Sequence, residues 1–319
     1  MKQIDSSHKA SVYRRLQISF ARRFNGCDLT LTLMVLPFVI FIIMFYYAQL
    51  FGWTYAFVNY LPGRSLFQQE FVGFKYFLKL FAPGSRFPIA FKNTLIYGFL
   101  GILASPIPAL MAVFLAELPK GRFARIIQTV TSFPNFISWV LVFSVCFMFF
   151  SIEGKFSQVL VSIGLWKSGY NLLADESVTY ILQTLLGVWK SAGWTAIIYL
   201  STIAGIDPEL YDAAAIDGAG RWHKMYHITI KSILPTYFVM LVLQISGLMN
   251  AGFEQFFVFH NSLVADKVEV LATFAYRIGI GNGEISYGTA IGMTQSIISI
   301  VLLFSINKLA KKVTGSSVI

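Results

Sequence analysis

Long apolar stretches separated by short polar segments run through the whole sequence. A helix that crosses a bilayer needs about 20 mostly apolar residues, because each residue adds about 1.5 Å along the helix axis. Six stretches meet this requirement, and they cover residues 29–50, 94–118, 126–150, 180–205, 236–256 and 287–309. The pattern predicts an all-α integral membrane protein with six transmembrane helices in one domain at 29–309.

Composition supports this prediction. Apolar residues make up 56% of the 319 residues and charged residues only 13%, against about 45–50% and about 25% in soluble domains. A soluble domain of this size could not cover so much apolar surface with so few charges. The composition therefore excludes a soluble globular protein.

Three prolines interrupt the predicted spans. Pro106 and Pro108 lie in the second stretch, and Pro134 lies in the third. A proline frees a backbone carbonyl, and in lipid that carbonyl must find a partner on a neighbouring helix or in a water-lined cavity. The prolines indicate a packed bundle.

The formal net charge of +10 is distributed unevenly along the chain. If both termini are cytoplasmic, fifteen of the 25 lysines and arginines lie inside and nine outside, with Lys190 within a span. Basic residues concentrate in cytoplasmic loops of membrane proteins. We therefore expect both termini in the cytoplasm, and basic residues that contact membrane lipid and no nucleic acid.

Three segments lie outside these spans. Residues 1–28 alternate apolar and basic positions, which is typical of a cytoplasmic amphipathic helix at the membrane surface. Residues 53–92 form an aromatic-rich outer segment, either a cap or half-helices on the membrane or a simple aromatic belt. Residues 310–319 are predicted to be a cytoplasmic tail.

The loop at 206–235 carries the most informative motif. Asp207 and Pro208 are suited to cap and begin a helix, and small alanines follow. Gly218 and Gly220 then permit a sharp turn into a second, basic and aromatic arm. The loop is too polar to enter the bilayer. It is predicted to be a docking element, with an ordinary linker as the alternative.

The same loop resembles the motif of permease subunits of bacterial ABC importers, in which Glu-Ala-Ala is followed after three residues by Gly and after nine more by Ile-x-Leu-Pro. The matching positions are Asp212, Ala213, Ala214, Gly218 and Ile228. Asp212 replaces the usual Glu and keeps its charge. Ile230 and Lys231 replace the Leu and Pro, and Pro235 follows four residues later. These departures leave the bend into the fifth span in doubt.

The resemblance implies a type I ABC importer permease fold, in which this loop is the cytoplasmic coupling helix that contacts an ATPase. It implies that role for Asp212, Ala213, Ala214 and Gly218, and we expect the basic Arg221 to face the same partner. The implied partners are two cytoplasmic ATP-binding subunits, a second permease chain that is homologous but different, and an extracytoplasmic solute-binding protein. ATP and Mg are then cofactors of the partner ATPases and not of this chain.

Other segments are similar to the sugar-uptake branch of these importers. Residues 71–74, 91–96 and 211–219 carry this similarity. Residues 275–279 and 286–292 are similar to the permeases for large oligosaccharides and polysaccharides, including the alginate type. The implied substrate is a carbohydrate, and the implied location is the bacterial cytoplasmic membrane.

Motifs for catalysis are missing from the sequence. It contains no G-x-x-x-x-G-K-[ST] phosphate loop and no G-x-S-x-G nucleophile elbow. Its four histidines and two cysteines have no metal-ligand spacing. No catalytic residue and no metal site is predicted, so the chain is expected to be the transport subunit and not an enzyme.

Polar residues at membrane depth are costly and usually face a bundle interior or an aqueous path. The candidates in the fifth span are Gln244, Asn250 and Glu254, where Glu254 is the only acid placed well inside a span. Amide and carboxylate groups could bond sugar hydroxyls. Alternatively, Glu254 is a shallow residue at the outer interface.

The fourth span offers Trp189, Lys190 and Trp194. Aromatic faces stack on sugar rings, and the lysine could take hydroxyl groups. Alternatively, Lys190 could extend toward the membrane surface.

The predicted function is import of an oligosaccharide or polysaccharide by alternating access, powered by the partner ATPases. Two alternatives are an ABC importer permease for an amino acid, polyamine or anion, and a membrane scaffold or channel with no role in transport.

Overall fold

The computed structural model describes residues 26–119, 121–250 and 252–314. It consists of two compact units, Met1–Tyr55 and Ala56–Ile319. Only the last three positions of the predicted surface helix at 1–28 are among the described residues, and they already belong to α2 (Gly26–Ile42). From α2 the helical path continues through a π-helical turn at Ile43–Tyr47 and a 3-10 segment at Ala48–Phe57.

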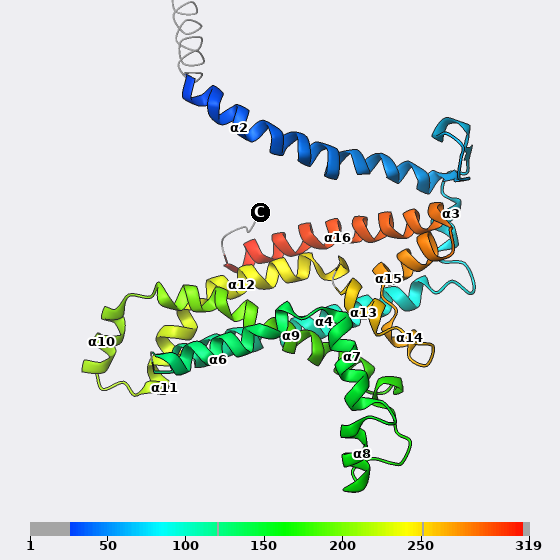
Figure 1. Ribbon diagram of the computed structural model, residues 1–319. Coiled ribbons are helices and arrows are strands. Elements are labelled where there is room, and N and C mark those ends of the chain that lie inside the picture. Colours follow the sequence, from blue (N-terminus) through cyan, green and yellow to red (C-terminus); the bar gives the residue numbers. More distant parts are fainter. Residues whose placement is uncertain (1–25, 120, 251, 315–319) are drawn as a thin grey trace, which may run out of the picture. The chain divides into compact units, whose positions relative to one another are not determined.

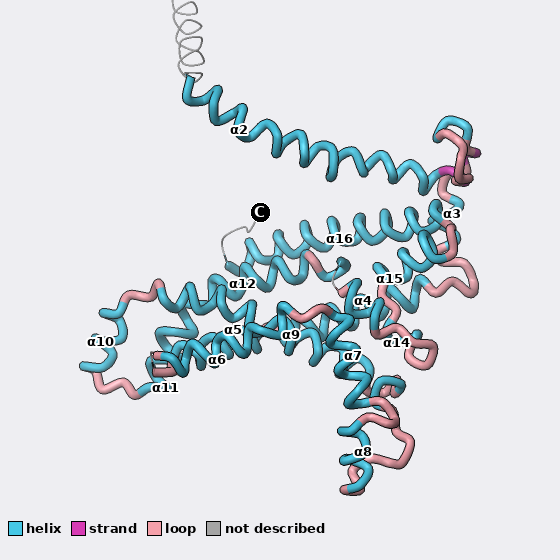
Figure 2. Tube along the Cα trace, in the orientation of Figure 1, coloured by secondary structure: helices cyan, strands magenta, loops and turns pink. Residues whose placement is uncertain are grey.

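The second unit is a helical bundle with one short pair of strands (Figures 1 and 2). Its helices are α3 Lys75–Lys79, α4 Phe87–Ala104, α5 Pro106–Ala116, α6 Arg122–Ser132, α7 Trp139–Phe150, α8 Lys155–Ser162, α9 Thr179–Ala204, α10 Pro208–Ile216, α11 Arg221–Lys224, α12 Lys231–Ser246, α13 Phe253–Val258, α14 Ala265–Val268, α15 Leu271–Tyr276 and α16 Ile285–Thr314. Short 3-10 turns lie at Leu66–Gln68, Phe133–Phe136, Leu172–Ala174 and Leu248–Asn250, and π-helical turns lie at Met225–Ile230 and Arg277–Gly281.

Five helical stretches in the described residues are long and apolar enough to cross a membrane. They are Thr30–Phe57, Phe87–Ala116, Trp139–Ser162, Arg221–Ser246 and Ile285–Lys308. The predicted fourth span corresponds to α9, which has 26 residues but is not one of the five. Its Gln, Lys, Ser and Thr side chains make α9 more polar than the others. The chain is thus an all-helical membrane protein with five candidate spans.

The single span predicted at 236–256 is wrong in its bounds. The helix begins much earlier, at Arg221, and ends at Ser246. A 3-10 turn follows, and Gly252 has a left-handed φ of 88° before α13 begins. A side chain at that φ would be strained, so this glycine supports the break. Apolar residues lie on both sides of the break, so the hydropathy of the sequence predicts one span across α12 and α13.

The stretch at 126–150 is also divided. α6 ends at Ser132, Pro134 lies in the 3-10 turn, and α7 begins only at Trp139. At this place α9 lies close to the end of α6, because a Cβ on Gly193 would lie 2.0 Å from the carbonyl oxygen of Thr131. The helix break at Pro134 therefore lies next to the point where Gly193 of α9 approaches the end of α6.

The segment predicted as a cap or an aromatic belt is folded on α16. β1 (Val58–Asn59) pairs antiparallel with β2 (Glu70–Phe71). The Ser286 hydroxyl at the start of α16 donates to the Val58 carbonyl at 2.7 Å and accepts from the Tyr60 N–H at 3.0 Å. These contacts fix Val58 and Tyr60 to the start of α16, and Phe71 in the same segment stays exposed.

Candidate functional site

α10 and its flanking turns form the loop that carries the motif, at one end of the bundle (Figure 1). The Asp207 carboxylate accepts the Glu209 N–H at 3.0 Å, so the predicted N-cap is confirmed. After α10, the Ala219 N–H donates to the Ala214 carbonyl at 2.8 Å, and Gly218 has a φ of +74°. The turn therefore depends on a glycine at position 218.

This loop presents an open surface. Asp212, Ala213 and Gly218 are exposed, and Ala214 is half-buried. The large apolar side chain of Ile216 is 87% exposed, and none of the α10 residues is buried. This side of the loop is therefore accessible, and its side chains are small apart from Ile216.

A hollow of about 440 Å³ lies behind the turn. Its lining includes Asp217, His223, Lys224 and His227. The two histidine rings stack with their centroids 4.0 Å apart. Sequence reasoning did not select these histidines, although their spacing of four residues places them on one helix face.

Arg221 contacts an acid inside the same chain. Its Nε donates to the Glu117 carboxylate at 2.6 Å, and its terminal nitrogen donates to the Glu117 carbonyl. Glu117 follows directly after α5, and Arg221 begins the helix that continues to Ser246. The predicted partner-facing residue thus joins α5 to the second arm of the loop.

Exchanging the two charges is expected to preserve this connection. A positive charge at a helix N-terminus and a negative charge at a helix C-terminus each oppose the helix dipole, by about 0.3–1 kcal/mol. Arg221 and Glu117 occupy these unfavourable ends, and their mutual contact compensates them. We expect Arg221→Glu to lower the thermal unfolding midpoint of the purified protein, and Arg221→Glu with Glu117→Arg to restore most of it. Thermal unfolding in detergent checks this, and equal decreases in both variants would contradict it.

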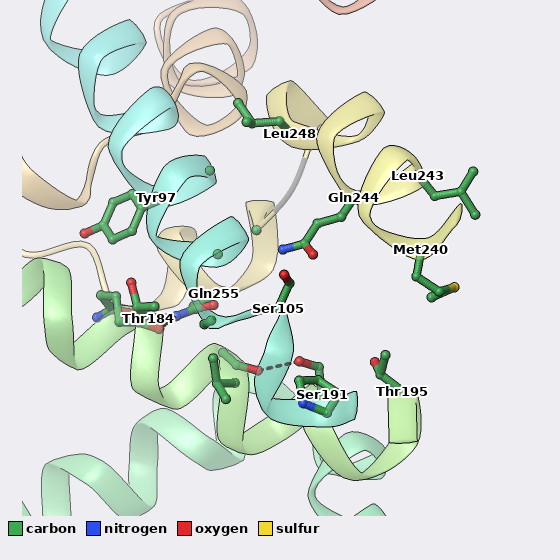
Figure 3. A pocket seen from close by; sticks show the side chains of 18 of the residues that line it. Tyr97, Ser105, Thr184, Ser191, Thr195, Met240, Leu243, Gln244, Leu248 and Gln255 are labelled. Atoms are coloured by element: carbon green, nitrogen blue, oxygen red, sulfur yellow. Dashed lines mark hydrogen bonds between the residues drawn. The ribbon is translucent and has the colours of Figure 1, made fainter. Parts of the chain in front are cut away.

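A cavity of about 530 Å³ lies within the second unit, between α4, α5, α9 and α12 (Figure 3). Gln244 projects from α12 toward α4, where its amide nitrogen lies 3.2 Å from the position of a Cβ on Gly101. The lining also contains Ser191 and Thr195 from α9. Gln244 is thus the predicted pathway residue that lines this cavity.

A second glutamine in the lining is fixed by its neighbours. The buried Gln255 on α13 donates from its amide nitrogen to the Gln183 carbonyl at 2.7 Å and to the Gln183 side-chain oxygen at 2.8 Å. Gln183 also lines the cavity. Gln255 therefore lies in the same cavity as Gln244, although the break after α12 separates the two residues.

Lys190 donates hydrogen bonds to backbone carbonyls at the break between α6 and α7. Its ammonium group donates to the carbonyls of Pro134, Asn135 and Ile137 at 3.3, 2.8 and 2.6 Å. It also lies 5.5 Å from the centre of the Trp139 ring. A lysine has three donors, so the three carbonyls can occupy all of them.

Trp189, Trp194 and Glu254 do not line the cavity. Trp189 and Trp194 are about half exposed, and Trp194 packs edge-on against Phe136 with centroids 5.5 Å apart. Glu254 is exposed in the first turn of α13, so it does not lie inside a long span. Asn250 ends a 3-10 turn, and its side chain lies outside the described part of the structure.

A cluster of charged residues joins the ends of α4, α14 and α15. Glu269 is 1% exposed and accepts hydrogen bonds from Arg86, at 2.9 Å, and from Arg277. Arg86 also pairs with Asp266, and Asn93 donates to the carbonyls of Asp266 and Glu269 at 2.9 and 2.8 Å. Partial burial lowers the pKa of Arg86, but bonds and charge interactions with Glu269 and Asp266 raise it by more. These residues are far apart in sequence, so no local pattern indicated the cluster.

Residues 104–315 match the family model described as "Binding-protein-dependent transport system inner membrane component". The chain belongs to this family. It is a permease component of an ABC importer and not the ATPase, as the sequence motif predicted. The matched region contains the whole loop at 206–235 and most of the cavity lining.

Two relatives from Bacillus subtilis (strain 168) support this assignment. The permease is 36% identical over 287 residues to Protein LplB, and this match covers 89% of each chain. It is also 36% identical over 284 residues to the polygalacturonan/rhamnogalacturonan transport system permease protein YteP, covering 88% of each chain.

The permease is also similar to solved structures. A chain in the crystal structure of a bacterial alginate ABC transporter, in complex with an alginate pentasaccharide-bound periplasmic protein, matches with a TM-score of 0.81 and 29% identity. The match covers 91% of this permease and 96% of that chain. The ABC importer permease fold is thus shown by structure as well as by sequence.

Proposed function

We propose that this permease imports an oligosaccharide or polysaccharide across the inner membrane by alternating access. The observation that carries this proposal is the cavity, whose lining includes the amide of Gln244, the hydroxyls of Ser191 and Thr195, and the aromatic Trp139. Amides and hydroxyls exchange hydrogen bonds with sugar hydroxyls, and aromatic faces pack against sugar rings. The carbohydrate names of the relatives point to the same solute class.

The proposal includes the topology and the partners. α9 serves as the sixth span, because its 26 residues extend about 39 Å and its polar face lines the cavity. Both termini and the loop at 206–235 then lie in the cytoplasm, and the charged cluster at Glu269 lies on the outer side. A second permease chain, two ATP-binding subunits and a solute-binding protein complete the transporter.

Coupling rests on the exposed surface of α10 (Pro208–Ile216). Asp212, Ala213, Ala214 and Gly218 contact an ATPase subunit there, and Arg221 joins the loop to Glu117 and α5. When ATP binding closes the ATPases, α10 moves with them, and the attached helices change the access to the cavity.

Asp212→Lys with Ala214→Trp is expected to abolish the coupling. The new charge and the large ring would prevent close docking at α10, so uptake of labelled oligosaccharides should fall by about tenfold or more. Glu153→Lys makes the same charge change at an exposed residue outside the loop and should leave uptake unchanged. Both variants are compared in the complete transporter, at equal amounts of inserted permease. Normal uptake by the double variant would contradict the docking role.

Uptake itself tests the solute class. The transporter should import labelled oligosaccharides in an ATP-dependent manner, and should not import amino acids, polyamines or inorganic anions. Import of one of these solutes in place of any oligosaccharide would favour the alternative permease.

A further inference from the structure

The lining of the cavity is uncharged. Among its described residues there are glutamines, serines, threonines, tyrosines and apolar side chains, and none is an aspartate, glutamate, lysine, arginine or histidine. Gln244 from α12 and Gln183 and Gln255 opposite supply amide groups, and Ser191 and Thr195 supply hydroxyls. These groups can bond a neutral sugar on several sides.

The lysine in the neighbouring helix is not available as a counter-ion. Lys190 lies on α9 one residue before Ser191, but its ammonium group donates to three carbonyls of the 134–137 break. It lies over the Trp139 ring, and Lys190 itself is not among the described residues that line the cavity. Releasing it would leave those three carbonyls without this donor.

The charged groups at the end of the bundle pair with one another or lie over an aromatic ring. Arg86 pairs with both Asp266 and Glu269, and a terminal nitrogen of Arg277 pairs with Glu269. Lys267 lies over the Tyr180 ring, with its ammonium 5.3 Å from the ring centre. None of these charged residues is among the described residues that line the cavity.

We infer that this permease's part of the pathway selects uncharged sugar segments and discriminates against uronates. A uronate carboxylate loses its hydration in such a cavity, and without a cation that loss is not compensated. The inference rests on the proposed function and narrows its substrate class. It separates this permease from relatives whose names or descriptions refer to acidic polysaccharides such as polygalacturonan and alginate.

Matched probes test the inference in the complete transporter, reconstituted with its own solute-binding protein and ATPases. The probes are a panel of labelled neutral oligosaccharides and the same compounds oxidised at C6 to uronates, which keep the length and the linkage. We expect import of the neutral member of a pair to be about tenfold or more faster than import of its uronate. Equal or faster import of the uronates would overturn the inference.

Substitutions of Gln244 test whether the selectivity between neutral sugars and uronates comes from the cavity or from the solute-binding protein. Gln244→Lys places a cation in the lining and should raise the ratio of uronate to neutral import by about tenfold. Gln244→Met keeps the size without a charge and should leave that ratio unchanged. Because the solute-binding protein is the same in all three transporters, an unchanged ratio in Gln244→Lys would also overturn the inference. Failure to import any member of the panel, with ATP hydrolysis intact, would contradict the proposed function.

Discussion

Glu269→Gln is expected to destabilise the permease by about 3 kcal/mol. Glu269 is almost completely buried and bonds both Arg86 and Arg277. Removing one partner of a buried ion pair typically costs about 3–5 kcal/mol, because the remaining charge has no compensation. Here both guanidinium groups are about two-fifths exposed, at 39% and 42%. Solvent screens part of the loss, so the lower end of that range applies.

Asp266→Asn is the matched control. The same change from carboxylate to amide affects a side chain that is 57% exposed and that pairs with Arg86. Exposed pairs contribute at most about 1 kcal/mol. Thermal unfolding of the purified permease in detergent should therefore show a much larger decrease of the midpoint for Glu269→Gln. Equal decreases in the two variants would show that burial of Glu269 has no energetic consequence.

Lys190→Met is expected to cost about 3 kcal/mol or more and to lower the amount of inserted protein. The substitution keeps the length of the side chain but leaves the carbonyls of Pro134, Asn135 and Ile137 without the ammonium donor. Each buried polar group without a partner costs about 1–3 kcal/mol.

Ser191→Ala provides the control on the next residue of α9. The Ser191 hydroxyl donates to the Gly187 carbonyl of its own helix, so its loss should change stability by less than about 1 kcal/mol. Thermal unfolding and quantified insertion distinguish the two possible roles of Lys190. A stable Lys190→Met variant that loses only transport would indicate a pathway residue and contradict the structural role.

The sequence was sufficient for features that depend on local pattern. Apolar stretches of about 20 residues indicated the membrane helices, and Asp207, Pro208 and Gly218 indicated a capped helix and a turn. These features depend on burial and backbone preference, which neighbouring residues determine. The match at 104–315 then confirmed the family that the motif around Asp212 had suggested.

Other features depend on contacts between distant residues. Hydropathy could not reveal the break after Ser246, since both sides of it are apolar. Lys190 looked like a pathway residue because sequence shows its depth but not the three carbonyls at 134–137 that it binds. The Glu269 cluster was missed for the same reason, because Arg86 is 183 positions away in sequence.

The helical stretch from Arg221 to Ser246, which includes the π-helical turn at Met225–Ile230, connects the loop at 206–235 to the cavity. Its 26 residues extend about 39 Å, so a tilt of about 5° at one end would shift the other by about 3 Å. Gln244 lies near one end, and the contact with Glu117 lies at the other. Such a connection works in both directions, because coupling free energies are reciprocal. If α10 contacts an ATPase as proposed, a sugar that binds better in one tilt of this stretch would change the affinity of that contact, which offers a direct route for substrate to stimulate ATP hydrolysis.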